Sequence, residues 1–149
     1  FTNKQDLFLT LFDELMRQII GQFARPDPAL PAAAQLETLL ASSAQLITHD
    51  SPLRGLPLNF LMELWQEEVF WGRYQAAIEP FQSLVQTIIE AGIASGEFRP
   101  VAANALSWAL IAQYDGLMLY ALTGLSADVN AQVAALNELV LAGLGRRFN

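Results

Sequence analysis

The chain has 149 residues, of which 53% are hydrophobic and 15% are charged, and its net charge is -7. This length suits one domain with a substantial core, and the acidic balance argues against direct binding of nucleic acid, which needs clustered positive charge. The absence of Cys excludes disulfides and thiolate metal sites and is typical of a cytoplasmic protein. The longest run without Lys, Arg, Asp or Glu is 15 residues, against the ~20 that a membrane-spanning helix needs.

Apolar periodicity, with proline and glycine breaks between the periodic segments, predicts an all-α bundle of about six helices. Asn3 and Asp6 are typical of a helix start, Pro80 predicts a kink or break in the fourth helix, and Ser126 is a candidate cap for the sixth. No segment alternates with a period of two, so no sheet is expected. The helices are expected at residues 4–23, 32–48, 58–70, 72–95, 101–123 and 127–147.

The most informative segment covers residues 89–124. Gly96 can adopt the left-handed conformation that closes a helix, and Pro100 cannot continue a helix but can start one. From 101 to 123 the only charged residue is Asp115. A helix this apolar must be buried on most sides.

The sixth helix adds a second broad apolar stripe, flanked by Ala and Gly residues that permit close approach of another helix. Two such adjacent helices favour a four-helix dimer interface with two helices from each copy. The alternative is a monomeric bundle that buries both helices internally. The expected interface residues are Leu106, Leu110, Leu117, Val129, Val133, Leu136, Val140 and Leu144.

Few residues could support catalysis. His49 and Asp50 would suit a metal-dependent hydrolase only with further His ligands, and the sequence has none. Glu63, Glu67 and Glu68 lie within two helical turns, but none belongs to the Glu-x-x-His motif of di-metal bundles. We therefore expect no enzyme, no metal site and no cofactor.

Aromatic side chains are the stronger functional signal. Three Trp, three Tyr and nine Phe in one small helical domain can line an adaptable apolar cavity, although any single aromatic residue more often fills a core. Glu63 and Asp115 lie in apolar sequence contexts, where buried polar groups need partners. An amine or several hydroxyl groups of a ligand could supply them.

Three segments resemble the tetracycline-repressor (TetR) family of transcriptional regulators. Phe1-Thr-Asn-Lys-Gln-Asp-Leu-Phe8 resembles the segment that joins the DNA-binding head of that family to its body. Gly96-Glu-Phe-Arg-Pro100, followed by an apolar helix ending in Asp115-Gly-Leu117, resembles its C-terminal pattern. Leu61-Met-Glu-Leu-Trp65 is the third similar segment. The order of the three is more specific than any one of them.

The resemblance implies an all-α homodimer with a small-molecule pocket in its body and a helix-turn-helix head that binds operator DNA. It places the head before Phe1, with residues 1–6 as its trailing edge and residues 1–149 as the effector-binding and dimerisation domain. Lys4 matches a position where such proteins touch a DNA phosphate at a helix N-terminus. The family's helix order suggests these pocket residues: Phe12, Met16, Phe60, Glu63, Trp65, Tyr74, Phe81, Trp108 and Asp115.

These observations predict the effector-sensing and dimerisation domain of a cytoplasmic regulator, a repressor in bacteria, with a largely apolar ligand and no membrane partner. The ligand would favour one arrangement of residues 4–23, and the two heads would then no longer match successive major grooves. The alternative function is a helical carrier or sequestering protein for an apolar small molecule.

Overall fold

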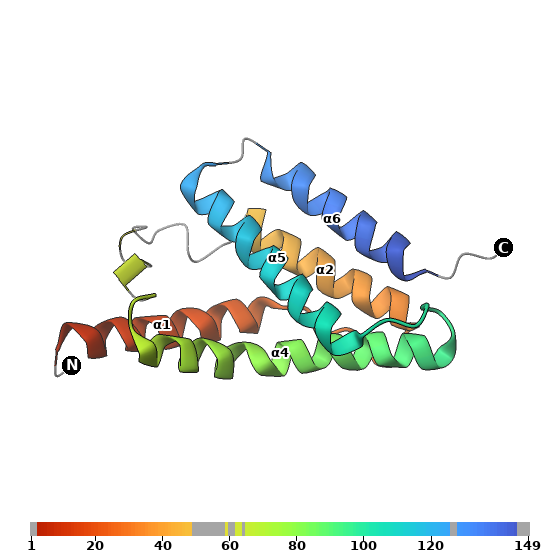
Figure 1. The fold of residues 1–149 in the computed structure, drawn as a ribbon, viewed down its shortest axis with the longest axis horizontal. Helices are drawn as coiled ribbons and strands as arrows, with labels where there is room; N and C mark the ends of the chain where they lie inside the picture. Colours follow the sequence, from red (N-terminus) through yellow and green to blue (C-terminus); the bar gives the residue numbers. More distant parts are fainter. Residues whose placement is uncertain (1–2, 49–58, 60–61, 64, 126–127, 146–149) are drawn as a thin grey trace.

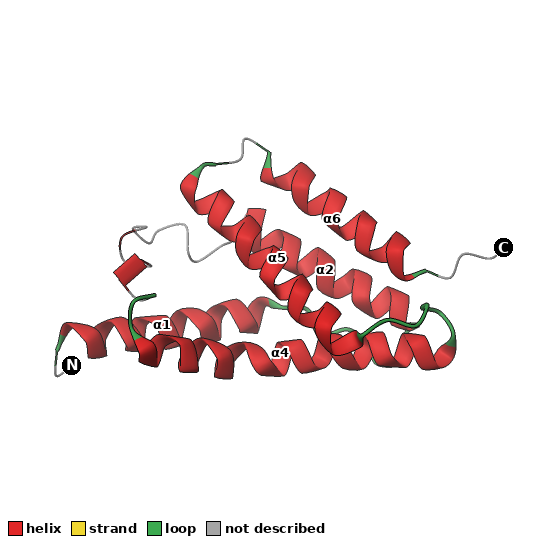
Figure 2. Ribbon diagram, viewed as in Figure 1, coloured by secondary structure: helices red, strands yellow, loops and turns green. Residues whose placement is uncertain are grey.

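A computed structural model describes residues 3–48, 59, 62–63, 65–125 and 128–145, and within these ranges the chain is an all-α bundle without a strand (Figure 1, Figure 2). The predicted fold class is therefore confirmed. Two helices, α1 and α4, run side by side along the long axis, and the other three cross them obliquely (Figure 1). The five helices are α1 (Lys4–Gln22), α2 (Ala32–Thr48), α4 (Glu68–Ser95), α5 (Ala103–Thr123) and α6 (Val129–Leu144).

Side-chain caps mark the starts of α1 and α6. The Asn3 side chain accepts a hydrogen bond of 2.8 Å from the backbone N–H of Asp6, so α1 begins where the Asn-to-Asp spacing predicts. Asp128 caps α6 by accepting from the N–H of Ala131 at 2.9 Å. The candidate cap Ser126 lies outside the described residues.

The prediction of one helix over residues 58–70 is wrong. Its described residues are helical only as far as Glu63, and Glu67 is extended, with φ of -88° and ψ of 121°. An extended residue cannot continue the helical hydrogen bonds, so the following residues belong to α4, which begins at Glu68 instead of Gly72. Helix α4 continues through Pro80, so the expected break does not occur. Pro80 lies on the exposed face of α4, where water can bond to the carbonyl group that loses its helical partner.

The segment from Gly96 to Arg99 joins three helices at one end of the bundle. Gly96 takes a φ of 83° and ends α4, as the sequence predicts. The Glu97 carboxylate accepts from the backbone N–H groups of Ala32 and Ala33, both at 3.1 Å, and so caps α2. The Arg99 backbone N–H donates to the carbonyl of Leu144 at 2.9 Å, and this bond satisfies an unpaired carbonyl at the end of α6.

Phe98 completes this junction by packing on a glycine. Its side chain is 2% exposed, and its backbone N–H donates to the carbonyl of Gly92 at 2.9 Å. A Cβ atom at Gly92 would lie 2.2 Å from the Phe98 ring, so only glycine fits there. We call this end of the bundle, centred on Gly92, Glu97, Phe98 and Leu144, the closed end.

The core divides into two clusters. The first joins α2, α4, α5 and α6 and includes the closed end, with Leu36, Leu39 and Ile89 almost fully buried. The second joins α1 to α4 through Phe12, Phe70 and neighbouring residues. We call the region of the second cluster the hollow end, because the main cavity opens there.

No helix within the described residues is long and apolar enough to cross a membrane.

Candidate ligand-binding cavity

A partly open cavity of about 370 Å³ lies between four helices at the hollow end. This volume is within the range of small-molecule sites, which begins at about 300 Å³. Almost all of its wall is apolar. The lining residues are Phe12, Leu15, Met16, Ile19, Phe23, Ser43, Leu46, Ile47, Trp65, Phe70, Trp71, Tyr74, Ile78, Phe81, Ile111, Tyr114, Asp115, Gly116, Met118, Leu119 and Leu122.

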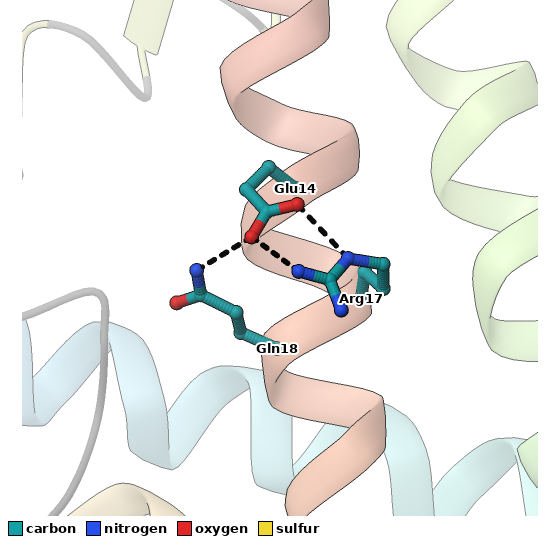
Figure 3. A network of polar contacts seen from close by, with 3 residues as sticks. All are labelled: Glu14, Arg17 and Gln18. Atoms are coloured by element: carbon teal, nitrogen blue, oxygen red, sulfur yellow. Dashed lines mark hydrogen bonds and ion pairs between the residues drawn. The ribbon is translucent and has the colours of Figure 1, made fainter.

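Helix α1 supplies one wall because its apolar residues recur at i+3 and i+4. Phe12, Met16 and Ile19 therefore share the face that lines the cavity. A polar network occupies exposed positions of the same helix: Glu14 accepts from Arg17 Nε at 2.9 Å and from Gln18 Nε2 at 2.8 Å (Figure 3). These bonds, first those from Arg17, lower the pKa of Glu14. The network keeps charge on the surface of α1 and out of the cavity.

Aromatic rings form a continuous cluster in the wall. The Phe70 ring lies 4.6 Å from that of Phe12, 5.1 Å from that of Trp71 and 6.2 Å from that of Tyr74, measured between centroids. Trp71 also donates from Nε1 to the backbone carbonyl of Trp65 at 3.1 Å. The rings of α1 and α4 thus pack against one another, and these contacts hold this part of the cavity wall in place.

Asp115 is the only charged residue among the described residues that line the cavity. The Tyr74 hydroxyl donates to its Oδ2 atom, which links α4 to α5 across the cavity. Loss of hydration among apolar neighbours raises the pKa of Asp115, and the bond from Tyr74 opposes that shift. Asp115 is nevertheless accessible to water, so we place it where the cavity opens. Burial and the neighbouring carboxylate raise the pKa of Tyr74, which therefore keeps its proton and remains a donor.

The remaining polar side chains of the wall are already paired within the protein. The Tyr114 hydroxyl donates to Asn137 Oδ1, and the Ser43 hydroxyl donates to the carbonyl of Leu39 at 2.9 Å. Burial raises the pKa of Tyr114, so this hydroxyl also stays protonated. Among the described lining residues, a ligand therefore meets rings, aliphatic and methionine side chains, and one carboxylate.

The structure brings together six of the nine residues predicted to bind a ligand. These are Phe12, Met16, Trp65, Tyr74, Phe81 and Asp115. Phe60 lies outside the described residues. Glu63 does not line the cavity, because its Oε2 atom pairs with Lys4 Nζ at 2.8 Å on the surface. Trp108 is 36% exposed and also lies outside the wall. That any of these side chains contacts a ligand stays a prediction.

Sequence reasoning missed most of the aliphatic wall. Leu15, Ile19 and Ile78 stand one helical turn from predicted residues, so helical spacing could have found them. Leu46 and Ile47 of α2 gave no such signal, because an inward-facing apolar residue looks the same in a sequence whether it meets another side chain or an empty space.

Three of the predicted dimer-interface residues face the core of the single chain. Leu110, Val133 and Leu144 are buried there, and they hold α5 and α6 against the bundle. Leu106, Leu117, Val129, Leu136 and Val140 are partly buried. The outward faces of the two helices carry several alanines at helical spacing and one large apolar residue each. The exposed apolar positions are Ala105, Trp108, Ala109 and Ala112 on α5, and Ala131, Ala134, Ala135, Leu139 and Ala142 on α6.

No group of three or more His, Cys, Asp or Glu that could hold a metal ion occurs among the described residues.

The fold is similar to that of a solved bacterial regulatory protein in the tetR family from Rhodococcus RHA1. The TM-score is 0.77 at 17% sequence identity, and the match covers 99% of this chain and 77% of that chain. No protein-family model and no curated protein matches the sequence. The chain therefore has a tetR-like fold, established by its three-dimensional arrangement.

Proposed function

We propose that this chain is the effector-sensing and dimerisation domain of a bacterial tetR-type transcriptional regulator, and that it acts as a repressor in the cytoplasm. The observation that carries the proposal is an apolar cavity of about 370 Å³ between α1, α2, α4 and α5 within a tetR-like fold. The proposal assigns the chain no catalytic activity. Operator DNA would be read by a helix-turn-helix head joined to the N-terminus of α1.

The cavity favours a binding role because empty apolar space is costly. Large-to-small substitutions in protein cores lose stability in proportion to the volume that they leave, at about 24 cal/mol per Å³. A ring-lined space of this size, kept open between four helices, is therefore better explained by a ligand than by imperfect packing. The ligand would be largely apolar, to match the wall.

Helix α1 is the part of the cavity wall that could transmit binding. Its inward face contributes Phe12 and Met16, and its outward face is tied to α4 by the ion pair between Asp13 and Arg73. A ligand that prefers one position of α1 over another would shift the population of the two positions. A head carried by α1 would move with it, and the spacing of two heads on DNA would change.

Dimerisation is supported by the small-residue faces of α5 and α6. Alanines at helical spacing allow the backbones of two helices to approach closely, and Trp108 and Leu139 offer apolar area that a single chain leaves in water. We place the partner copy on this outward face, because Val133 and Leu144 of the predicted α6 stripe are buried in the chain's own core.

The ligand-binding part is tested with the neutral apolar dye N-phenyl-1-naphthylamine, whose fluorescence rises in apolar sites. We expect the dye to bind the unmodified chain, and Leu119→Trp to weaken its binding about tenfold or more, because the larger ring fills the cavity. Leu84→Trp, on an exposed position of α4, is the matched control and should bind as the unmodified chain does. Equal binding by both variants would place the dye elsewhere.

The dimer is tested by analytical ultracentrifugation at micromolar concentration. Ala109→Arg should raise the dissociation constant more than about a hundredfold, because it would bury an unpaired charge in each half of the interface. Ala76→Arg, on an exposed position of α4, should leave the dimer intact. A monomeric unmodified chain that still binds the dye would favour a carrier for apolar molecules over a regulator.

A further inference from the structure

We propose that the ligand of this cavity is an amphipathic cation, a protonated amine on an aromatic or aliphatic body, with the amine bound by Asp115. The inference rests on the proposed ligand-binding function and adds the chemical class of the ligand. Two observations support it: the polar atoms of the wall that remain available to a ligand, and the positions of those atoms.

Among the described residues that line it, the cavity offers an acceptor and no side-chain donor that lacks a partner. The hydroxyls of Ser43 and Tyr114 donate to the carbonyl of Leu39 and to Asn137, and the Trp71 N–H donates to the carbonyl of Trp65. The Tyr74 hydroxyl donates to Asp115 itself. Among the described residues of the wall, the strongest acceptor for a ligand group is therefore the Asp115 carboxylate, which also accepts from Tyr74.

Charge selects among possible donors. Asp115 is the only ionisable group with a charge at neutral pH among the residues that line the cavity from α1, α2, α4 and α5. An anionic ligand would meet this carboxylate with no compensating cation among the described lining residues. A neutral ligand would remove water from the carboxylate and return a hydrogen bond without an opposite charge. A cation replaces the lost water with an opposite charge.

The rest of the wall suits the same ligand class. The faces of aromatic rings attract cations within about 6 Å, and Tyr74, the hydrogen-bond partner of Asp115, belongs to the ring cluster of Phe70 and Trp71. Asp115 is accessible to water, so an amine there would keep part of its hydration while the apolar body enters the cavity. The raised pKa of Asp115 agrees with a carboxylate that lacks a nearby positive charge in the free protein.

Tyr74 acts as the positioning residue in this arrangement. Its hydroxyl holds Oδ2 of Asp115, which orients the carboxylate and leaves Oδ1 for the ligand. Tyr74→Phe keeps the ring in the wall and removes only this bond. Tyr74→Phe should reduce the preference for a cation by less than Asp115→Asn does. Binding of a neutral compound should change little.

The test compares three compounds that share a naphthalene ring and differ in charge: 2-(1-naphthyl)ethylamine as the cation, 2-(1-naphthyl)ethanol as the neutral compound and 1-naphthylacetate as the anion. Isothermal titration calorimetry at neutral pH measures each against the unmodified chain, Asp115→Asn, and Glu79→Gln as a control that removes one negative charge from an exposed position of α4. Leu119→Trp reports whether binding occurs in the cavity.

We expect the cation to bind about ten- to a hundredfold more tightly than the alcohol, and the anion to bind most weakly. Asp115→Asn should abolish the preference for the cation and leave the alcohol bound, whereas Glu79→Gln should preserve the preference. Equal binding of cation and alcohol, or a cation preference that survives in Asp115→Asn, would overturn the assignment of the ligand class while the cavity function stands. If neither the three compounds nor N-phenyl-1-naphthylamine binds, the cavity function fails as well.

Discussion

The two ends of the bundle differ in how their side chains meet. At the closed end, the Phe98 ring fills the space left by Gly92, and Glu97 and Arg99 satisfy the backbone groups at the ends of two other helices. At the hollow end, the rings and aliphatic side chains of four helices leave a cavity of about 370 Å³. The same kinds of apolar residue thus make a tight junction at one end and an open space at the other.

The difference suggests a division of roles. Close packing at one end maximises dispersion contacts and leaves no space for a guest, so this end stabilises the bundle. The hollow end gives up part of that stabilisation, which a bound ligand could restore through linkage between binding and folding. Helices α4 and α5 contribute to both ends, so a ligand in the cavity would contact two helices that also pack in the first core cluster.

The two ends should respond differently to loss of a leucine side chain. Leu39 is 1% exposed in the first core cluster, and Leu39→Ala should cost about 2–5 kcal/mol of unfolding free energy because it opens a new cavity. Leu119→Ala only enlarges an existing space and should cost less than about half as much. Urea unfolding followed by circular dichroism measures both values. Equal losses would mean that the hollow end is closed in solution.

A methyl group at Gly92 tests the tight junction directly. The added Cβ would lie 2.2 Å from the Phe98 ring, so Gly92→Ala should destabilise the chain by about 1–3 kcal/mol through overpacking. Gly72→Ala lies in the same helix with nothing near the added carbon, and it should stabilise by up to about 1 kcal/mol through helix propensity. Thermal unfolding of the pair measures the contrast, and a neutral Gly92→Ala would show that Phe98 can move aside.

Acid should weaken the closed end through Glu97. Hydrogen bonds from the N–H groups of Ala33 and Ala32 lower the pKa of Glu97 below its ordinary value of 4.5. The carboxylate therefore contributes stability that is fully present above that ordinary value and is lost as the pH falls through the lowered pKa. Glu97→Gln should reduce Tm by a few degrees at neutral pH, and the difference from the unmodified chain should shrink in acid.

The control for this pH series is Glu90→Gln, which removes the same charge from the exposed surface of α4. It should follow the unmodified chain across the series. A gap between Glu97→Gln and the unmodified chain that stays constant down to the lowest pH would argue against the capping role of the charged carboxylate.

Helix positions were the most predictable feature because their signals are local. The prediction for α2 matches its bounds at both ends, and Asn3 and Gly96 mark the start of α1 and the end of α4 as expected. The segment around Glu67 was not predictable in this way. Its apolar and acidic residues have helical spacing, and only the extended backbone of Glu67 separates them into two elements.

The candidate site was predictable in part. Phe12, Tyr74 and Asp115 line the cavity as the helix order suggested, whereas Trp108 is directed to the outside of α5. The dimer prediction selected the leucine-rich stripe of α6, because apolar residues are the visible signal of burial. In the structure Val133 and Leu144 of that stripe are buried in the core, and the alanine face is more exposed. Contact of the stripe with a second copy stays a prediction.

The amino-acid sequence alone was sufficient for the all-α class, for the cap at Asn3, for the helix end at Gly96 and for the inward faces, because these features depend on residues within a few positions of each other. The cavity and the outward face of α5 and α6 depended on the tertiary arrangement. Whether inward-facing side chains touch or leave a gap is set by the distances among four helices at once, and no local spacing in the chain encodes those distances.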